Sequence, residues 1–162
     1  MNYDYFSQLE AGTLAKAENE SEQAFMERIL SAVFAEKSDE LSDRINDKLA
    51  PRFAGCSADD RAMSVTFAAQ EWMLNPNGTL HGGMLSTAMD IVLSVLARYL
   101  AKKRVMVTAQ LSMNFLRAIQ ENDTFTVHAA ADHVGRRSVV IQAYVTVNDT
   151  DKRAATASAI LM

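Results

Sequence analysis

NPNGTLHGG, residues 75–83, leads into the apolar run MLSTAMDIVLSVLARYL, residues 84–100. Asn-Pro and Asn-Gly pairs are typical of a turn. In the run that follows, apolar residues recur every three or four positions, which predicts a helix of about 20 residues and ~30 Å. Apolar side chains cover so much of this helix that other elements must pack against most of it.

One polar line interrupts the apolar surface of this helix, and Asp90 lies on it two turns from the helix start. A carboxylate in that position is costly unless it is hydrogen-bonded. The helix begins at Gly82 and Gly83, where backbone N–H groups are unpaired and carry positive potential, and where glycine lets a ligand approach closely. Together with His81, the stretch offers a candidate oxyanion site, a carboxylate and a histidine.

Length and composition indicate one domain with a sizeable core, since the chain has 162 residues, 49% of them hydrophobic and 22% charged. Polar residues interrupt the longest apolar stretch before it reaches about 18 positions, so no membrane partner is expected. The N-terminus has neither the basic nor the apolar region of a signal peptide. The single Cys56 cannot form an internal disulfide. A cytoplasmic location is the expectation that follows.

Charge is distributed unevenly along the chain. Residues 1–50 carry a net charge of −6 and residues 51–162 a net charge of +2. The acidic first part argues against nucleic acid as a partner. Two small basic clusters, Lys102-Lys103-Arg104 and Arg136-Arg137, are candidates to meet a phosphorylated small molecule. For either cluster alone, the solvated end of an element is the simpler interpretation.

Helices are expected in the first 50 residues. A weak apolar pattern precedes residue 18, and a stronger one begins at Asn19 or Ser21, where Asn19 and Glu22 have the spacing of a capping box. Ser38 is suited to cap a further helix, which Pro51 would end.

Beyond residue 55 the apolar period changes to two, which predicts strands. The alternating segments fall at 63–67, 105–115, 124–131, 139–147 and 154–162. Residues 71–74 are expected to form a short extended piece, and Cys56 a loop before the first strand. Short connections between the last four strands imply antiparallel neighbours, and one sheet beside one very apolar helix is expected to curl around it. We therefore expect an α+β fold, with a helical extension at 1–55 and the main domain at 56–162.

This arrangement resembles the hotdog-fold acyl-CoA thioesterases, in particular the phenylacetate-pathway and thioesterase-superfamily-member-2 type. The residues that carry the resemblance are NPNGTLHGG at 75–83, Asp90 nine residues after His81, and the strand TAQLSMNFLR at 108–117. The Gly135-Arg136-Arg137 segment between two late strands also fits. The resemblance covers roughly residues 60–162 and carries nothing over to the first 50 residues.

The resemblance implies hydrolysis of an acyl-CoA thioester. It implies that the Gly82 N–H polarises the thioester carbonyl, which the Asn75 side chain helps to hold. Asp90 would activate or position the attacking water, and Thr108 stands where the family has a Ser or Thr that helps to hold it. His81 would orient the loop or assist the leaving thiolate.

The resemblance also implies how the substrate is bound and how the chain assembles. Gly83, Gly135, Arg136 and Arg137 are expected to contact the substrate, with the arginines near the CoA phosphates. No cofactor is expected, because CoA is part of the substrate. In the family, the Asn, His and Gly come from one subunit and the Asp and the Ser or Thr from its neighbour, so a homodimer or a dimer of dimers is expected.

The chemistry suits these residue types. Thioester hydrolysis builds negative charge on the carbonyl oxygen, which backbone donors at a helix start stabilise, and a carboxylate can take the proton of water. A thiolate leaves readily, so no metal is required. His128 and His133 lie five positions apart on one expected strand and would face opposite sides, which gives no support for a metal site.

Each candidate residue also has a structural interpretation. Gly82 and Gly83 would provide a tight entry to a packed helix, and Asp90 would be a buried structural carboxylate. Thr108 would be a strand former, and His81 a loop histidine. Two other functions stay open: a non-catalytic acyl-CoA-binding or regulatory protein, and a hotdog dehydratase. Asp90 on the polar line, with His81 before the glycines, favours hydrolysis.

Overall fold

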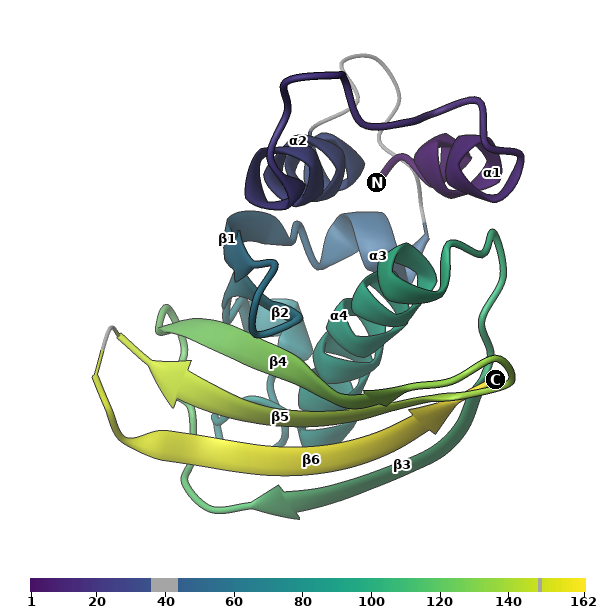
Figure 1. Cartoon of the computed structure of the whole chain (residues 1–162). Helices are drawn as coiled ribbons and strands as arrows, with labels where there is room; N and C mark the ends of the chain where they lie inside the picture. Colours follow the sequence, from purple (N-terminus) through teal and green to yellow (C-terminus); the bar gives the residue numbers. More distant parts are fainter. Residues whose placement is uncertain (36–43, 149) are drawn as a thin grey trace.

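The computed structural model describes residues 1–35, 44–148 and 150–162 of the chain. Six antiparallel strands form one sheet in the order β1-β2-β4-β5-β6-β3, and helix α4 lies against one of its faces (Figure 1). In chain order the elements are α1 (Asp4–Glu10), α2 (Glu22–Phe34), α3 (Ile45–Lys48), β1 (Arg52–Ser57), β2 (Ala62–Ala68), the 3₁₀ helix η1 (Glu71–Met73), α4 (Gly82–Ala101), β3 (Thr108–Phe115), β4 (Thr124–Val134), β5 (Val139–Val147) and β6 (Arg153–Leu161).

Helix α4 is the centre of the core. Nine of its side chains are buried, and it contacts strands β2 to β6. Among the helices that the structure describes, α4 is the one that is long and apolar enough to cross a membrane, but a core helix has the same properties. Here the curved sheet covers it (Figure 1). The sequence prediction of a sheet curled around one apolar helix is confirmed.

Successive side chains along each strand point to opposite faces of the sheet, so one set faces α4 and the other faces outward. Val127 and Val145 lie directly opposite each other on β4 and β5 and are fully buried. Their neighbours Thr126 and Thr146 form the next pair and are partly exposed. A slip of one residue would exchange the two faces, so burial of the valines fixes the register.

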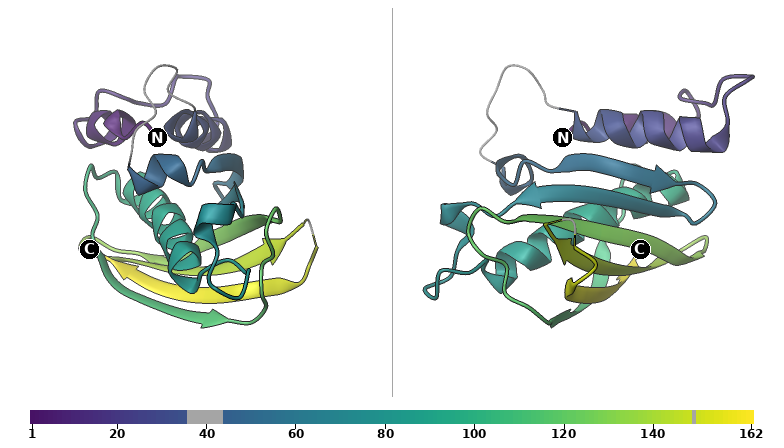
Figure 2. Two further views of the ribbon diagram at one scale, coloured as in Figure 1. Left: turned by 180° about the vertical axis from the view of Figure 1, so that it is seen from behind. Right: turned by 90° about the vertical axis from the view of Figure 1, so that its left-hand side faces the viewer.

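The N-terminal helices form a further layer on the side of α4 away from the sheet, as two opposite views show (Figure 2). Helix α2 packs against the edge strand β1. The Gln23 side chain donates a hydrogen bond to the Cys56 carbonyl at 2.9 Å and accepts one from the Ala58 N–H at 2.8 Å. These contacts cover backbone groups that an edge strand would otherwise leave unpaired.

The N-terminal part differs in places from what the sequence predicted. Ser21 caps α2, because its Oγ accepts a hydrogen bond from the Ala24 N–H at 3.1 Å; the capping box of Asn19 with Glu22 was wrong, since Glu22 is already the first helical residue. The expected cap Ser38 lies outside the described residues. The described helix α3 ends before Pro51, and the expected division between residues 55 and 56 falls inside β1.

Three predictions in the body of the fold were wrong. Cys56 lies in strand β1 rather than in a loop, because β1 pairs with β2 and completes a sixth strand. Residues 71–73 form a 3₁₀ turn rather than an extended piece. His128 and His133 lie on the same outer face of the sheet. A spacing of five in a regular strand would place them on opposite faces, but a bulge between Ala131 and His133 adds one residue to β4 and turns His133 to the outer face.

The burial of α4 generates a stability prediction. Leu93 is fully buried at the centre of the helix, so Leu93→Ala leaves a cavity and should lower the free energy of unfolding by about 2–5 kcal/mol. Urea titration followed by circular dichroism measures it. The matched control Ile45→Ala removes an aliphatic side chain that is 39% exposed and should cost less than about 1 kcal/mol. An equal decrease in the free energy of unfolding in the two variants would contradict the interpretation that α4 is the centre of the core.

Candidate active site

The turn before α4 is held by the side chain of Asn75. Its Oδ1 accepts hydrogen bonds from the backbone N–H groups of Asn77 (2.9 Å) and Thr79 (3.3 Å), and its Nδ2 donates to Thr79 Oγ1 (2.9 Å). Gly78 adopts a φ of +75°, a conformation that favours glycine. Asn75 therefore positions the loop that leads to the helix.

His81 is the N-cap of α4. Its Nδ1 accepts a hydrogen bond from the Gly83 N–H at 2.9 Å, so the ring orients the start of the helix and uses one of the two glycine donors. The Gly82 N–H has no acceptor among the residues that the structure describes. Gly82 rather than Gly83 therefore presents the free donor at the positive end of a 20-residue helix.

Asp90 is paired with Thr108. The Thr108 hydroxyl, on the first residue of β3, donates a hydrogen bond to Asp90 Oδ1 at 2.6 Å, and both side chains are partly buried. This is the length of a charge-assisted O–H···O⁻ bond. The structure thus brings together the carboxylate and the hydroxyl that the sequence assigned to one water molecule.

Gly82 and Asp90 do not meet within one chain. They lie eight residues apart on a continuous helix, which separates them by ~12 Å along its axis. A carbonyl oxygen at the Gly82 N–H would be far from the reach of the Asp90 carboxylate. Each chain therefore presents two separate candidate half-sites, one at the start of α4 and the other at Asp90 and Thr108.

A hollow of about 340 Å³ adjoins the Gly82 half-site. The buried side chains of Leu80, Leu85 and Ile119 contribute to it, and Phe115 and Leu116 at the end of β3 form an exposed wall. Sequence reasoning did not identify Phe115. Its ring contacts Gly82 across 33 positions of sequence, and no local pattern signals such a contact.

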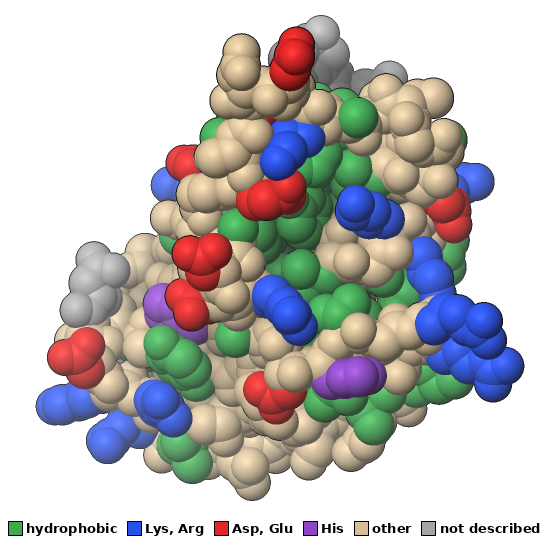
Figure 3. Space-filling view, in the orientation of Figure 1, with side chains coloured by type: hydrophobic (Ala, Val, Ile, Leu, Met, Phe, Trp, Pro, Cys, Tyr) green, Lys and Arg blue, Asp and Glu red, His purple; other side chains and the backbone are tan. Residues whose placement is uncertain are grey.

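The two basic clusters lie together at the end of the sheet that holds Thr108. The Lys103 ammonium donates a hydrogen bond to the Arg136 carbonyl at 3.3 Å, which joins the segment after α4 to the β4–β5 turn. Thr108 pairs with Leu161, which pairs with Val139 at the start of β5. The turn is thus two strand spacings, or ~10 Å, from Thr108. Blue side chains gather at this end of the molecule (Figure 3).

Gly135 has a structural role in the same turn. Its N–H donates a hydrogen bond to the Ser138 carbonyl at 2.9 Å. A Cβ at this position would lie 2.8 Å from His133 Nε2 and 3.3 Å from the Ser138 oxygen. A larger residue at this position would therefore displace the His133 ring and crowd the turn, and Arg136 and Arg137 on the same turn are exposed.

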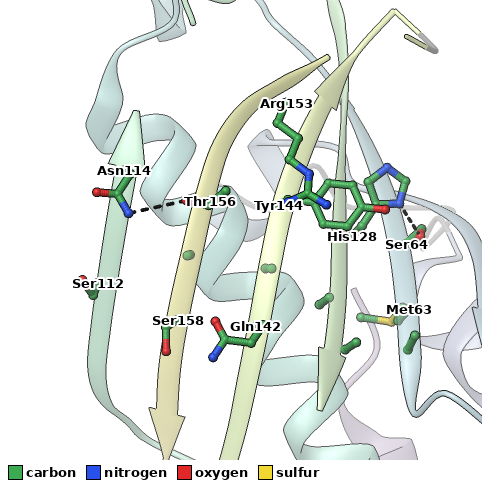
Figure 4. Close-up of a pocket in the computed structure, with 15 residues that line it drawn as sticks. Met63, Ser64, Ser112, Asn114, His128, Gln142, Tyr144, Arg153, Thr156 and Ser158 are labelled. Atoms are coloured by element: carbon green, nitrogen blue, oxygen red, sulfur yellow. Dashed lines mark hydrogen bonds between the residues drawn. The ribbon is translucent and has the colours of Figure 1, made fainter. Parts of the chain in front are cut away.

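A second hollow, of about 530 Å³, lies on the outer face of the sheet, away from both half-sites (Figure 4). Ser64 Oγ lies 2.9 Å from His128 Nδ1, the His128 ring stacks on Tyr144, and the Arg153 guanidinium lies 4.5 Å from the Tyr144 ring centroid. Burial lowers the pKa of His128. Since these strands are hydrogen-bonded to their neighbours, their N–H groups offer no oxyanion donor.

The family follows from comparison with known proteins. The sequence profile of the thioesterase superfamily matches residues 77–154. A protein of Pseudomonas aeruginosa that is named as an esterase is 32% identical over 97 residues, which are 59% of this chain and 72% of that protein. This chain belongs to the thioesterase superfamily. The match contains the α4 start, Asp90 and Thr108.

Two further comparisons bear on the superfamily member described here. An uncharacterised acyl-CoA thioester hydrolase of Haemophilus influenzae is 36% identical over 73 residues, or 45% of this chain and 47% of that protein. The chain spans about half the length of the first curated relatives it matches. The solved structure of a phenylacetic acid degradation-related protein from Ralstonia eutropha aligns over 98% of both chains, with a TM-score of 0.66 and 20% identity. The fold is the hotdog fold that the sequence predicted.

Proposed function

We propose that this protein hydrolyses an acyl-CoA thioester to the free acid and CoA. The observation that carries the proposal is the pair of half-sites: a free N–H donor at the start of α4, and a carboxylate bonded to a hydroxyl at the start of β3. The name of the Haemophilus influenzae relative supports acyl-CoA as the substrate class.

Two copies of the chain complete one site. Strand β3 is an edge strand, and no described element covers its free side. If two copies pair antiparallel about the middle of β3, the Thr108 end of one strand lies beside the Phe115 end of the other. Phe115 contacts Gly82 of its own chain. The pairing therefore brings Asp90 and Thr108 of one copy beside the Gly82 donor of the second.

The surface around β3 suits such a pairing. Four large apolar residues at the two ends of the strand are more than half exposed, namely Val105 (60%), Val107 (63%), Phe115 (56%) and Leu116 (53%). An open edge of eight residues flanked by apolar side chains favours association with another strand. Antiparallel pairing about a two-fold axis buries the same patch on both copies.

The proposed reaction begins with the substrate carbonyl oxygen at the Gly82 N–H. Asp90 of the paired copy, fixed by Thr108, takes a proton from a water molecule whose oxygen attacks the carbonyl carbon. The negative charge that develops on the carbonyl oxygen is stabilised by the Gly82 donor and the dipole of α4. The carbon–sulfur bond then breaks, and CoA leaves as a thiolate that takes up a proton.

The basic clusters are placed to bind the CoA phosphates. Lys103, Arg136 and Arg137 lie at the Thr108 end of the sheet, ~10 Å from the proposed catalytic pair. Exposed guanidinium groups bind phosphate by charge-assisted hydrogen bonds without the cost of burial. The CoA end of the substrate would therefore lie on the copy that supplies Asp90.

Replacing Asp90 tests the proposed base. Asp90→Asn keeps the shape and can still accept the Thr108 hydrogen bond, but it cannot take a proton from water. We expect kcat for CoA release, followed with a thiol reagent over a panel of acyl-CoAs, to fall by about 10² or more while acyl-CoA still binds. Asp90→Glu should keep partial activity. Hydrolysis by Asp90→Asn at the parent rate would contradict this mechanism, and binding without hydrolysis by the parent protein would favour a binding module.

A mixed dimer tests the division of the site. Gly82→Pro removes the N–H at the first helical position, where proline is well accepted, and His81 already has the extended ψ of 132° that a following proline favours. It should lower kcat by about 10²–10³, whereas Gly82→Ala adds the same Cβ and keeps the donor. A purified heterodimer of Gly82→Pro with Asp90→Asn contains one intact site, so it should recover about half the wild-type activity. An inactive heterodimer, or an active wild-type monomer, would overturn the division.

Substitution of the turn arginines tests the phosphate contacts. Arg136→Ala with Arg137→Ala should raise KM for acyl-CoA more than it lowers kcat, because it removes binding that is equal in ground and transition states. For the acyl pantetheine thioester, which lacks the nucleotide phosphates, the same variant should have the KM and kcat of the wild type. An unchanged KM for acyl-CoA would show that neither arginine contacts the substrate.

A further inference from the structure

We infer that Phe115 determines which acyl groups the site accepts, by closing the hollow beside Gly82 to long chains. The inference rests on the proposed thioesterase function and deepens it, since it assigns the acyl group to one hollow and one side chain. Phe115 is a specificity-determining residue in this interpretation and takes no part in proton transfer.

The position of the ring is the first argument. A Cβ built on Gly82 would lie 3.3 Å from Phe115 Cζ and 3.5 Å from Cε1, so the end of the ring lies against the residue that carries the free N–H. The side chain is nevertheless 56% exposed. The ring therefore lies beside the residue that carries the unpaired donor, where it can contact the group that this donor binds.

The direction of the substrate is the second argument. In the paired arrangement, the basic cluster that would bind the phosphates belongs to the copy that supplies Asp90. The sulfur of the thioester then points toward that copy. The acyl carbon chain points the other way, into the hollow that Leu80, Leu85 and Phe115 form next to Gly82.

The size and lining of this hollow give the substrate class. Its volume of about 340 Å³ is at the lower end of the range of ~300–1,000 Å³ found for small-molecule pockets. Leu80 and Leu85, which are at most 7% exposed, give it an apolar part. Three polar residues also line it, namely Asn75, Thr79 and Arg117. The hollow is therefore suited to a compact apolar acyl group, and the Phe115 ring stands where a longer chain would continue.

The test is a chain-length profile. We expect wild-type kcat/KM to be higher for hexanoyl-CoA than for dodecanoyl-CoA. Phe115→Ala should raise the dodecanoyl-to-hexanoyl ratio of kcat/KM by about tenfold or more, because the chain can extend through the space that the ring occupied. Phe115→Trp should lower the same ratio. A loss of stability alone would not move the ratio in opposite directions in the two variants.

Controls separate this inference from the function on which it rests. Ile45→Ala, which removes an exposed apolar side chain on α3, should leave the ratio unchanged. If the wild-type protein hydrolyses no acyl-CoA, the proposed function fails. If the wild type is active but Phe115→Ala and Phe115→Trp keep its chain-length ratio, the function stands and the role of Phe115 is overturned. An equal change in KM for every chain length would place the pantetheine arm, not the acyl group, against the ring.

Discussion

The burial of α4 inside the curved sheet is the constraint on which the rest of the structure depends. Nine buried side chains hold the helix against strands β2 to β6, and their apolar area is the largest source of free energy that keeps these elements together. The polar line of the helix, which includes Asp90, Ser94 and Arg98, stays partly exposed. The first residue of β3 supplies the hydroxyl that hydrogen-bonds Asp90. The packing that stabilises the helix therefore also fixes the position of its carboxylate.

Much of the fold was predictable from the sequence, because most elements bury one face and so carry a clear period. The run 84–100 and the alternating segments after residue 105 predicted α4 and four of the six strands, and Met63 to Phe67 predicted β2. Strand β1 was missed because its residues, RFAGCS, alternate weakly; helix α2 packs against this strand. The bulge before His133 was not predictable either, since the extra residue is accommodated by pairing with β5 and leaves no local mark in the sequence.

The candidate site was predictable in its parts but not in its geometry. The glycines, His81 and Asp90 lie in one short stretch, and Thr108 was assigned by resemblance; the structure brings Thr108 to 2.6 Å from Asp90. Asn75 and His81 form local hydrogen bonds that orient the loop and the helix start. Sequence could not identify Phe115, because its contact with Gly82 depends on how the end of β3 returns to the start of α4. Tertiary contacts of this kind have no period and no motif.

The separation of the two candidate half-sites follows from helix geometry. A rigid helix cannot direct its first N–H and a side chain eight residues later to the same atom, since ~12 Å lie between them. A second copy related by a two-fold axis can bring these groups together if it pairs beside β3, because the antiparallel register exchanges the two ends of the strand. Strand β1, at the other edge of the sheet, must then be prevented from pairing with a second copy. Gln23 of α2 does this at β1 by hydrogen-bonding the Cys56 carbonyl and the Ala58 N–H. The N-terminal layer thus leaves β3 as the open edge of the described sheet, where pairing would complete the chemistry.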